Sequence, residues 1–251
     1  MDELPNLCDV IAEHKWKTEY LIELLLGVLV VMSLAVIVPK SLFTPGMLAT
    51  GEGRFLDFFI NSAGLQIGSL FLVNRFLKQH GLTWRAAFGL GDGGVGRALL
   101  HGLWIGLLIA PLIMAMQAGC QWLFTQAEVA APRQDTVNTL VEAVRWDQQF
   151  YFAMIAIVFA PLMEEVVFRG VLYPALKFRG HRIAALWGTA LFFALMHGNA
   201  LSFVPLTVLG LAFVALYEWK GNLLISIVAH STFNAVNFIL IIYGREWMQH
   251  L

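Results

Sequence analysis

The chain has 251 residues, of which 59% are hydrophobic and only 13% are charged, and its formal net charge is −1. Soluble domains usually carry about 25% charged residues, so this composition excludes an ordinary water-soluble protein and indicates a polytopic membrane protein. The near-zero net charge gives no reason to expect nucleic acid as a partner.

The apolar segments of the chain predict its membrane-spanning helices. The first, roughly residues 20–38, is long enough to span a bilayer and has no A-x-A-like cleavage site after it, so we interpret it as an uncleaved first helix. Six more apolar stretches follow, at roughly 55–77, 98–124, 150–176, 183–199, 201–217 and 222–243. The expected fold is therefore an all-α bundle of about seven to eight transmembrane helices, the eighth being allowed because the third stretch is long.

Lys and Arg residues favour one side of this predicted bundle. They are more frequent in the loops on the side of the N-terminus, for example at Lys177, Arg179 and Arg182. Because loops rich in Lys and Arg stay in the cytoplasm, the N-terminus is expected to be cytoplasmic. The short loops and compact size are typical of a prokaryotic protein, which predicts the plasma (inner) membrane as its location.

The longest polar connection, residues 125–149, contains one amphipathic pattern. Val137, Leu140, Val141 and Val144 follow the i, i+3, i+4, i+7 spacing of a helix face. This predicts a short helix, which either lies at the outer membrane interface or only covers the end of the bundle.

Two other features are not expected to carry function. The stretch Gly91–Gly96 matches G-x-G-x-x-G, but a dinucleotide site needs a preceding strand, whereas these glycines join two predicted membrane helices. The two cysteines, Cys8 and Cys120, lie far apart in a polar and an apolar setting. Neither a disulfide nor a metal site is expected from them.

Polar residues inside the C-terminal apolar stretches are the informative ones. An unpaired ionisable group at the centre of a membrane helix costs about 2.5–3.5 kcal/mol, so such residues are usually functional. Three clusters qualify: Glu164 and Glu165 with Arg169, then His197, then His230 with Asn234.

Helix spacing separates the roles of the two glutamates. Glu165 and Arg169 are four residues apart and share a helix face, which predicts an ion pair. Glu164 lies about 100° away around the helix and is left free. His230 and Asn234 are also four residues apart, so they share one face of the last predicted helix.

Depth in the membrane brings the three clusters together. At 1.5 Å per residue, Glu164 lies about 20 Å from the loop at Lys177, and His197 lies about 22 Å from Arg182. His230 lies about 15 Å from Lys220 by the same rise. We therefore expect the three polar groups to meet well below the cytoplasmic face.

A carboxylate and two imidazoles in a partly dry cavity can activate water as general bases. A His and an Asn on one helix face can donate hydrogen bonds to a developing oxyanion. Neither a Ser or Cys in a nucleophile motif nor the H-E-x-x-H pattern is found. These residues indicate attack of water on a carbonyl, such as peptide hydrolysis.

Three motifs in order resemble those of a known family. Glu164–Arg169 reads E-E-x-x-x-R, Phe193–His197 reads F-x-x-x-H, and His230–Asn234 reads H-x-x-x-N. These are similar to the motifs of the CAAX protease and bacteriocin-processing family, also called CPBP or Abi, which includes the Ras-converting CAAX endopeptidases. The resemblance covers roughly residues 150–240.

The resemblance implies an intramembrane glutamic endopeptidase whose catalytic cavity opens to the cytoplasmic side. It implies that water is activated by Glu164 and His197, that the oxyanion is held by His230 and Asn234, and that the site is positioned by Glu165 and Arg169. It also implies a division into variable N-terminal helices with an interfacial segment (1–149), catalytic core helices (150–243) and a C-terminal tail (244–251). No cofactor is expected, and membrane lipid surrounds the protein.

Several alternatives remain open at this point. A zinc-dependent membrane protease could use the same residues, since Glu and His are zinc ligands. A bacteriocin-immunity or membrane partner protein without enzymatic activity could keep the same fold. A proton-coupled carrier is disfavoured, because carriers usually have repeated polar sites in both halves. The expected substrate is a membrane-associated or lipidated peptide or protein cut near its C-terminus, and the oligomeric state is not predicted.

Overall fold

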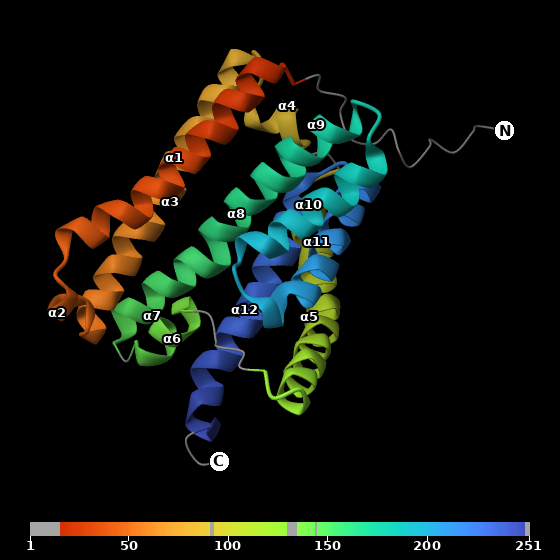
Figure 1. Ribbon diagram of the computed structural model, residues 1–251. Coiled ribbons are helices and arrows are strands. Elements are labelled where there is room, and N and C mark those ends of the chain that lie inside the picture. The colour runs from red at the N-terminus through yellow and green to blue at the C-terminus, as the bar shows by residue number, and fades with distance from the viewer. Residues whose placement is uncertain (1–15, 91–92, 130–134, 144, 249–251) are drawn as a thin grey trace.

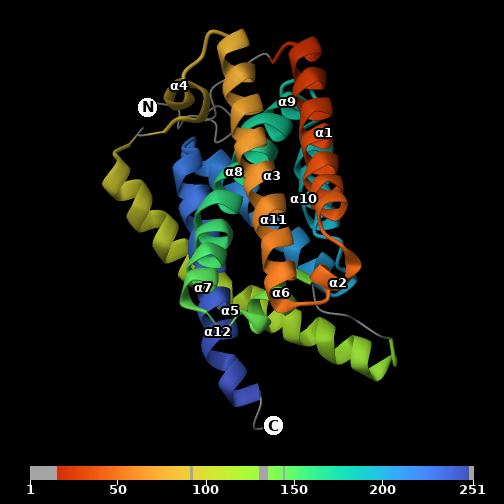
Figure 2. The ribbon, with the colours of Figure 1, turned by 90° about the vertical axis from the view of Figure 1, so that its left-hand side faces the viewer.

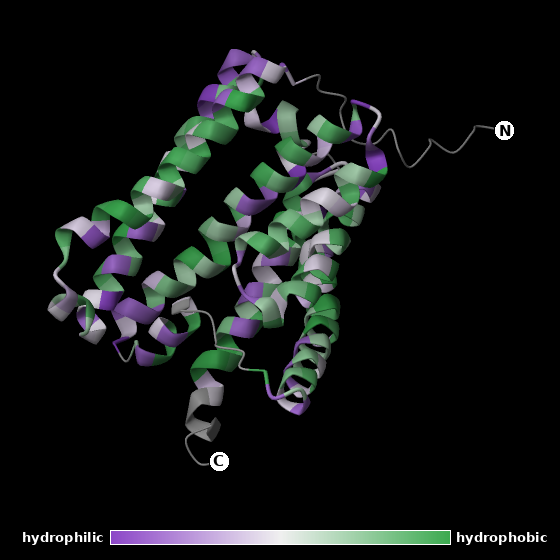
Figure 3. Ribbon diagram, in the orientation of Figure 1, coloured by the Kyte–Doolittle hydropathy of each residue, from purple (hydrophilic) through white to green (hydrophobic). Residues whose placement is uncertain are grey.

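The computed structural model describes residues 16–90, 93–129, 135–143 and 145–248, and all regular structure within these ranges is helical. The predicted all-α fold is thus confirmed. Six helical segments are long and apolar enough to cross a membrane: Thr18–Leu42, Gly51–Gln79, Val95–Gln126, Trp146–Lys177, Ala200–Lys220 and Leu223–Gly244. Hydrophobic residues cover most of their length, and hydrophilic residues gather toward the two ends of the bundle (Figure 3).

The helix in the predicted span at roughly 183–199 is shorter than expected. Helix α10 (Arg182–Met196) has 15 residues, or about 22 Å, which is less than the ~30 Å hydrocarbon core. It stops because Gly198 adopts a φ of +61°, a conformation that favours glycine. Asn199 then begins helix α11 (Ala200–Lys220), its side chain accepting the N–H of Ser202 at 3.0 Å. The count of seven to eight spans is therefore corrected to six long helices and one short apolar helix within the described residues.

The helices form two groups joined by one long central helix (Figures 1 and 2). Helices α1 (Thr18–Leu42) and α3 (Gly51–Gln79) pair at one side, linked by α2 (Pro45–Leu48). Helices α5, α10, α11 and α12 form the other group. The remaining bounds are Trp84–Phe88 for α4, Val95–Gln126 for α5 and Leu223–Met248 for α12.

The central helix is a single helical segment in which the winding changes. Its parts are α7 (Trp146–Ala153), the π-helix η1 (Met154–Phe159), α8 (Ala160–Glu165), the π-helix η2 (Val166–Leu172) and α9 (Tyr173–Lys177). Each π-helix ends two residues before a proline, Pro161 or Pro174. A proline lacks the N–H of a helical bond and its ring clashes with the preceding turn. Widening the turn relieves this clash and keeps the helix going.

Helix α6 (Asp135–Glu142) corresponds to the predicted amphipathic segment. Leu140 is buried there, as the spacing predicts, whereas Val144 lies outside the described residues. Arg54 of α3 donates to Glu142 at 2.6 and 3.0 Å and ties α6 to the end of the bundle. Its position at a membrane surface stays a prediction.

At the opposite end of the bundle, a half-buried carboxylate joins three elements. Glu218 of α11 accepts from Lys177 of α9 at 2.8 Å, from Arg182 of α10 at 2.9 Å, and from the hydroxyl of Tyr173. These contacts hold the ends of α9, α10 and α11 together, and the polar groups of the central helix lie deeper along the same elements.

Helices α5 and α12 are in close contact because two glycines of α5 face α12. A Cβ atom on Gly102 would lie 2.6 Å from Cβ of Val228, and one on Gly106 would lie 2.5 Å from Cβ of Thr232. The Gly106 position also lies 2.6 Å from the carbonyl oxygen of Ala229. The backbone of α12 on both sides of residue 230 therefore rests directly on α5.

We expect Gly106→Ala to destabilise the protein by about 1–3 kcal/mol, because the added methyl group forces the two backbones apart. Gly119→Ala on the same helix is the matched control, since a Cβ at Gly119 meets nothing within 4 Å. Alanine is the better helix former, so the control is expected to be neutral or slightly stabilising. Thermal unfolding in detergent measures both. Equal midpoints for the two variants would show that the contact at Gly106 does not limit stability.

Candidate active site

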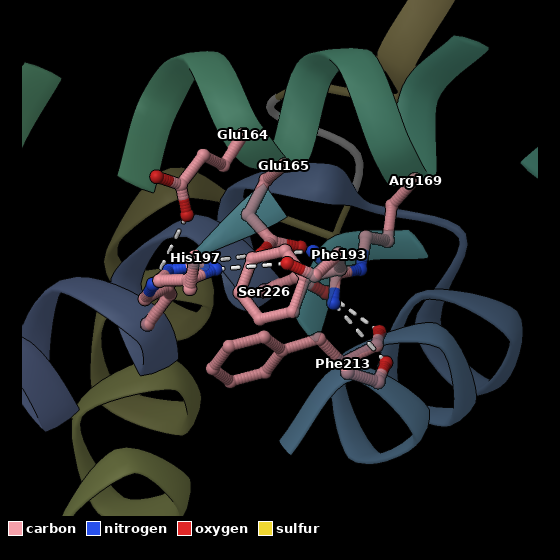
Figure 4. Close-up of polar contacts among 9 residues, drawn as sticks. Glu164, Glu165, Arg169, Phe193, His197, Phe213 and Ser226 are labelled. Carbon is pink, nitrogen blue, oxygen red and sulfur yellow. Dashed lines mark hydrogen bonds and ion pairs between the residues drawn. The ribbon is translucent and has the colours of Figure 1, made fainter. Parts of the chain in front are cut away.

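The structure places the predicted site residues on four elements (Figure 4). Glu164 and Glu165 end α8, Arg169 lies in η2, His197 follows the last residue of α10, and His230 and Asn234 lie on α12. The contacts described next join five of these side chains directly or through one shared aromatic ring. Asn234 instead contacts the backbone of the central helix.

The predicted ion pair is confirmed. A terminal nitrogen of Arg169 lies 2.9 Å from Oε1 of Glu165, and their side chains are 1% and 0% exposed. The other terminal nitrogen of Arg169 donates to the carbonyl of Gly210 at 3.2 Å. Oε2 of Glu165 and Nε of Arg169 are buried without a hydrogen-bond partner. The pair is thus completely withdrawn from solvent but only partly satisfied.

His230 lies between the two glutamates, a contact that the helix spacing alone did not predict. Its Nδ1 is 2.9 Å from Oε1 of Glu165, and its Nε2 is 3.7 Å from Oε2 of Glu164. An ionised carboxylate can only accept, so Nδ1 is the donor toward Glu165. The distance to Glu164 is too long for a hydrogen bond. Glu165 therefore orients the ring, and Nε2 is directed to the side of Glu164.

His197 has a fixed tautomer. Its Nδ1 lies 2.8 Å from the carbonyl oxygen of Phe193, one helical turn earlier. Since a carbonyl only accepts, Nδ1 carries a proton, and in the neutral ring the lone pair is then on Nε2. Both His197 and Glu164 are half-buried, the Glu164 side chain being 30% exposed, whereas His230 is only 3% exposed. Glu164 and His197 are thus the two bases of the set that solvent can reach.

Two phenylalanines pack against the charged groups. The ring of Phe193 lies 4.8 Å from that of His197, 5.9 Å from that of His230, and 4.5 Å from the guanidinium carbon of Arg169. Phe213 stacks on His230 at 4.8 Å and lies 5.4 Å from Arg169. Such contacts favour cationic groups over the ring faces. The first phenylalanine belongs to the F-x-x-x-H motif, but no sequence signal pointed to Phe213.

Asn234 is turned toward the central helix. Its Nδ2 donates to the carbonyl oxygen of Ala156 in η1 at 2.7 Å. A carboxamide has two N–H donors, so one is used by the helix backbone and the second remains for another acceptor.

Among the described residues, no group of three or more His, Cys, Asp or Glu side chains is arranged to hold a metal ion. Within that part of the chain, the side chains are therefore not placed as a zinc site.

Comparison with known proteins identifies the family of one part of the chain. The sequence model of a family described as type II CAAX prenyl endopeptidase Rce1-like matches residues 146–236. These residues are a domain of the Rce1-like CAAX endopeptidase family. The Rce1-like domain contains all six predicted site residues, and the resemblance seen in the motifs is confirmed. Membership of this family implies a peptidase.

One curated relative of this chain is "Uncharacterized protein YpbD" of Bacillus subtilis (strain 168). The two are 30% identical over 139 residues, which is 53% of this chain and 66% of that protein, just under two thirds of its length. No solved structure gives a significant match. The relative is bacterial, and its name states no activity.

Proposed function

We propose that the protein is an intramembrane glutamic endopeptidase in which Glu164 and His197 activate the attacking water. The family domain supports a peptidase, and one observation supports these two residues in particular. They are the half-buried ionisable members of the site, whereas Glu165, Arg169 and His230 are buried against one another. A base that must receive water has to be reachable, and the buried groups are already engaged.

In the proposed reaction, Glu164 takes a proton from water while Nε2 of His197 accepts a hydrogen bond from the same molecule. The water oxygen attacks the carbonyl carbon, and the electron pair of the C=O bond moves to oxygen. Asn234, through its second N–H, and His230, which for this role carries a proton on Nε2 as well as on Nδ1, donate to this oxyanion. The electron pair on the oxyanion then re-forms the C=O bond, the C–N bond breaks, and Glu164 gives the proton to the leaving nitrogen. Glu165 and Arg169 hold His230 in place.

The substrate we propose is a peptide or protein associated with the membrane, cut near a lipidated C-terminus. Glu164 lies in a membrane-length helix, thirteen positions before Lys177, or about 20 Å from that end. A peptide must therefore reach it at bilayer depth, and an attached lipid would favour this position energetically. The location we propose is a prokaryotic plasma membrane with the N-terminus in the cytoplasm, with membrane lipid as the surrounding partner and without nucleic acid.

The test is cleavage of peptides by the purified protein in detergent. The panel holds peptides that end in a prenylated CAAX sequence and the same peptides without the lipid. We expect cleavage of the prenylated peptides, a rate about 10²–10⁴-fold lower in His197→Ala, and no loss with a strong chelator. His101→Ala, which removes an exposed histidine on α5, is the matched control and should keep the wild-type rate.

Each contrary result has a definite meaning. Activity that a chelator abolishes and zinc restores would replace the glutamate mechanism by the zinc-dependent alternative. Wild-type protein that binds but never cleaves any peptide of the panel would favour the role of a membrane partner without enzymatic activity.

A further inference from the structure

The first π-helix leaves one backbone carbonyl without its helical partner. At the end of η1, the N–H of Ala160 donates to the carbonyl of Ile155, five residues earlier. With the same five-residue spacing of a π-helix, the next N–H donor would be that of residue 161, and it would donate to the carbonyl of Ala156. Residue 161 is proline, which has no N–H. Since Ala160 already donates elsewhere, neither helical donor is left for Ala156.

Asn234 supplies the missing donor from another helix. Its Nδ2 lies 2.7 Å from the carbonyl oxygen of Ala156, a short and therefore well-formed hydrogen bond. The bond is partly buried, and the neighbouring Pro161 is fully buried. A partly buried carbonyl without a partner costs free energy, and the carboxamide of Asn234 reduces that cost.

We propose that Pro161 is a positioning residue of the site, because the carbonyl it leaves free at Ala156 binds and orients the carboxamide of Asn234. With one N–H fixed on Ala156, the plane of the amide is set and its second N–H has a fixed direction. The contact itself ties α12 to η1, eight residues before Glu164 on the same central helix. The catalytic part of this inference rests on the proposed function.

A double-mutant cycle on Pro161 and Asn234 tests the proposal by two readouts. In the wild-type background, Asn234→Ala is expected to lower the unfolding midpoint in detergent by a few degrees, because the Ala156 carbonyl loses its partner. In the Pro161→Ala background, the new N–H of residue 161 can bond to the Ala156 carbonyl. Asn234→Ala should therefore lower the unfolding midpoint much less. Asn234→Leu, which keeps the side-chain volume, repeats the cycle if the alanine variant does not fold.

Pro161→Ala alone should reduce kcat about tenfold or more with a smaller change in KM, since it releases an oxyanion donor without removing it. A purely structural proline would not separate kcat from KM in this way. Pro174→Ala is the matched control, because Pro174 follows η2 as Pro161 follows η1. Pro174 leaves the carbonyl of Arg169 without its π-helical donor, but Asn234 bonds to Ala156 and not to this carbonyl. In the Pro174→Ala background, Asn234→Ala should lower the unfolding midpoint as much as it does in the wild type.

The two readouts separate this inference from the proposed function. Additive effects of Pro161→Ala and Asn234→Ala on the unfolding midpoint would overturn the pairing, whether or not the protein cleaves peptides. Coupled midpoints with an unchanged kcat in Pro161→Ala would overturn the positioning role in an active enzyme. A protein without peptidase activity would leave the midpoint cycle as a complete test of the Ala156 contact, while the proposed function alone would fall.

Discussion

Replacing Glu164 by glutamine is expected to lower the rate of peptide cleavage about 10²–10⁴-fold while leaving the unfolding midpoint nearly unchanged. The amide cannot take the proton of the attacking water, but it keeps the shape of the side chain. Little stability is at stake because Glu164 is half-buried and its contact with Nε2 of His230, at 3.7 Å, is longer than a hydrogen bond. The loss should therefore be found in kcat, with the fold retained.

The matched control is Glu165→Gln, one residue along the chain. Glu165 is fully buried and contacts Arg169 and His230 at 2.9 Å each, so its replacement should lower the unfolding midpoint as well as the activity. Steady-state cleavage and thermal unfolding of the two variants give the comparison. If Glu164→Gln kept full activity, or if only Glu165→Gln reduced it without loss of stability, the assignment of the base would pass from Glu164 to Glu165.

The sequence predicted the parts of this site that depend on local helix geometry. Glu165 and Arg169 were paired because residues four apart share a helix face, and the ion pair is present even though Arg169 lies in a π-helical turn. The same spacing separated Glu164 from this pair. The apolar stretches likewise predicted an all-helical membrane fold. A segment of about twenty apolar residues in a bilayer can satisfy its own backbone hydrogen bonds only as a helix.

Contacts between helices could not be obtained in this way. The bond from His230 to Glu165 joins residues 65 positions apart, and no spacing rule gives the rotation of one helix against another. Phe213 stacks on His230 from a helix without any motif residue. The bond of Asn234 to Ala156 also depends on a π-helical register that becomes visible only in three dimensions.

The short length of α10 is different, because its signal was present in the sequence. Gly198 and Asn199 directly follow His197, and a glycine followed by an Asn N-cap is typical of one helix ending and another beginning. The apolar stretch 183–199 continued through this point, so hydropathy extended the helix too far. The early stop has a functional consequence, since it puts His197 at a helix end, where its ring is partly exposed.

Replacing Arg169 by methionine is expected to destabilise the protein by about 3–5 kcal/mol, the largest stability effect that we predict. Methionine keeps the length of the apolar stem but removes the guanidinium that contacts Glu165. Glu165 would then be a carboxylate with 0% exposure that still contacts Nδ1 of His230. An uncompensated buried charge is costly, and much of this cost can be avoided only if Glu165 takes up a proton.

Arg75→Met is the control for this variant. Arg75 also pairs with a glutamate, Glu23, but the two side chains are 54% and 43% exposed, so the loss should be about 0–1 kcal/mol. Unfolding followed by circular dichroism in the same detergent measures both variants. Equal destabilisation would show that burial of the Glu165–Arg169 pair does not govern its contribution. Because Glu165 also orients His230, Arg169→Met should lose activity together with stability. Glu164→Gln should lose activity alone. This difference distinguishes the base from the groups that hold the site.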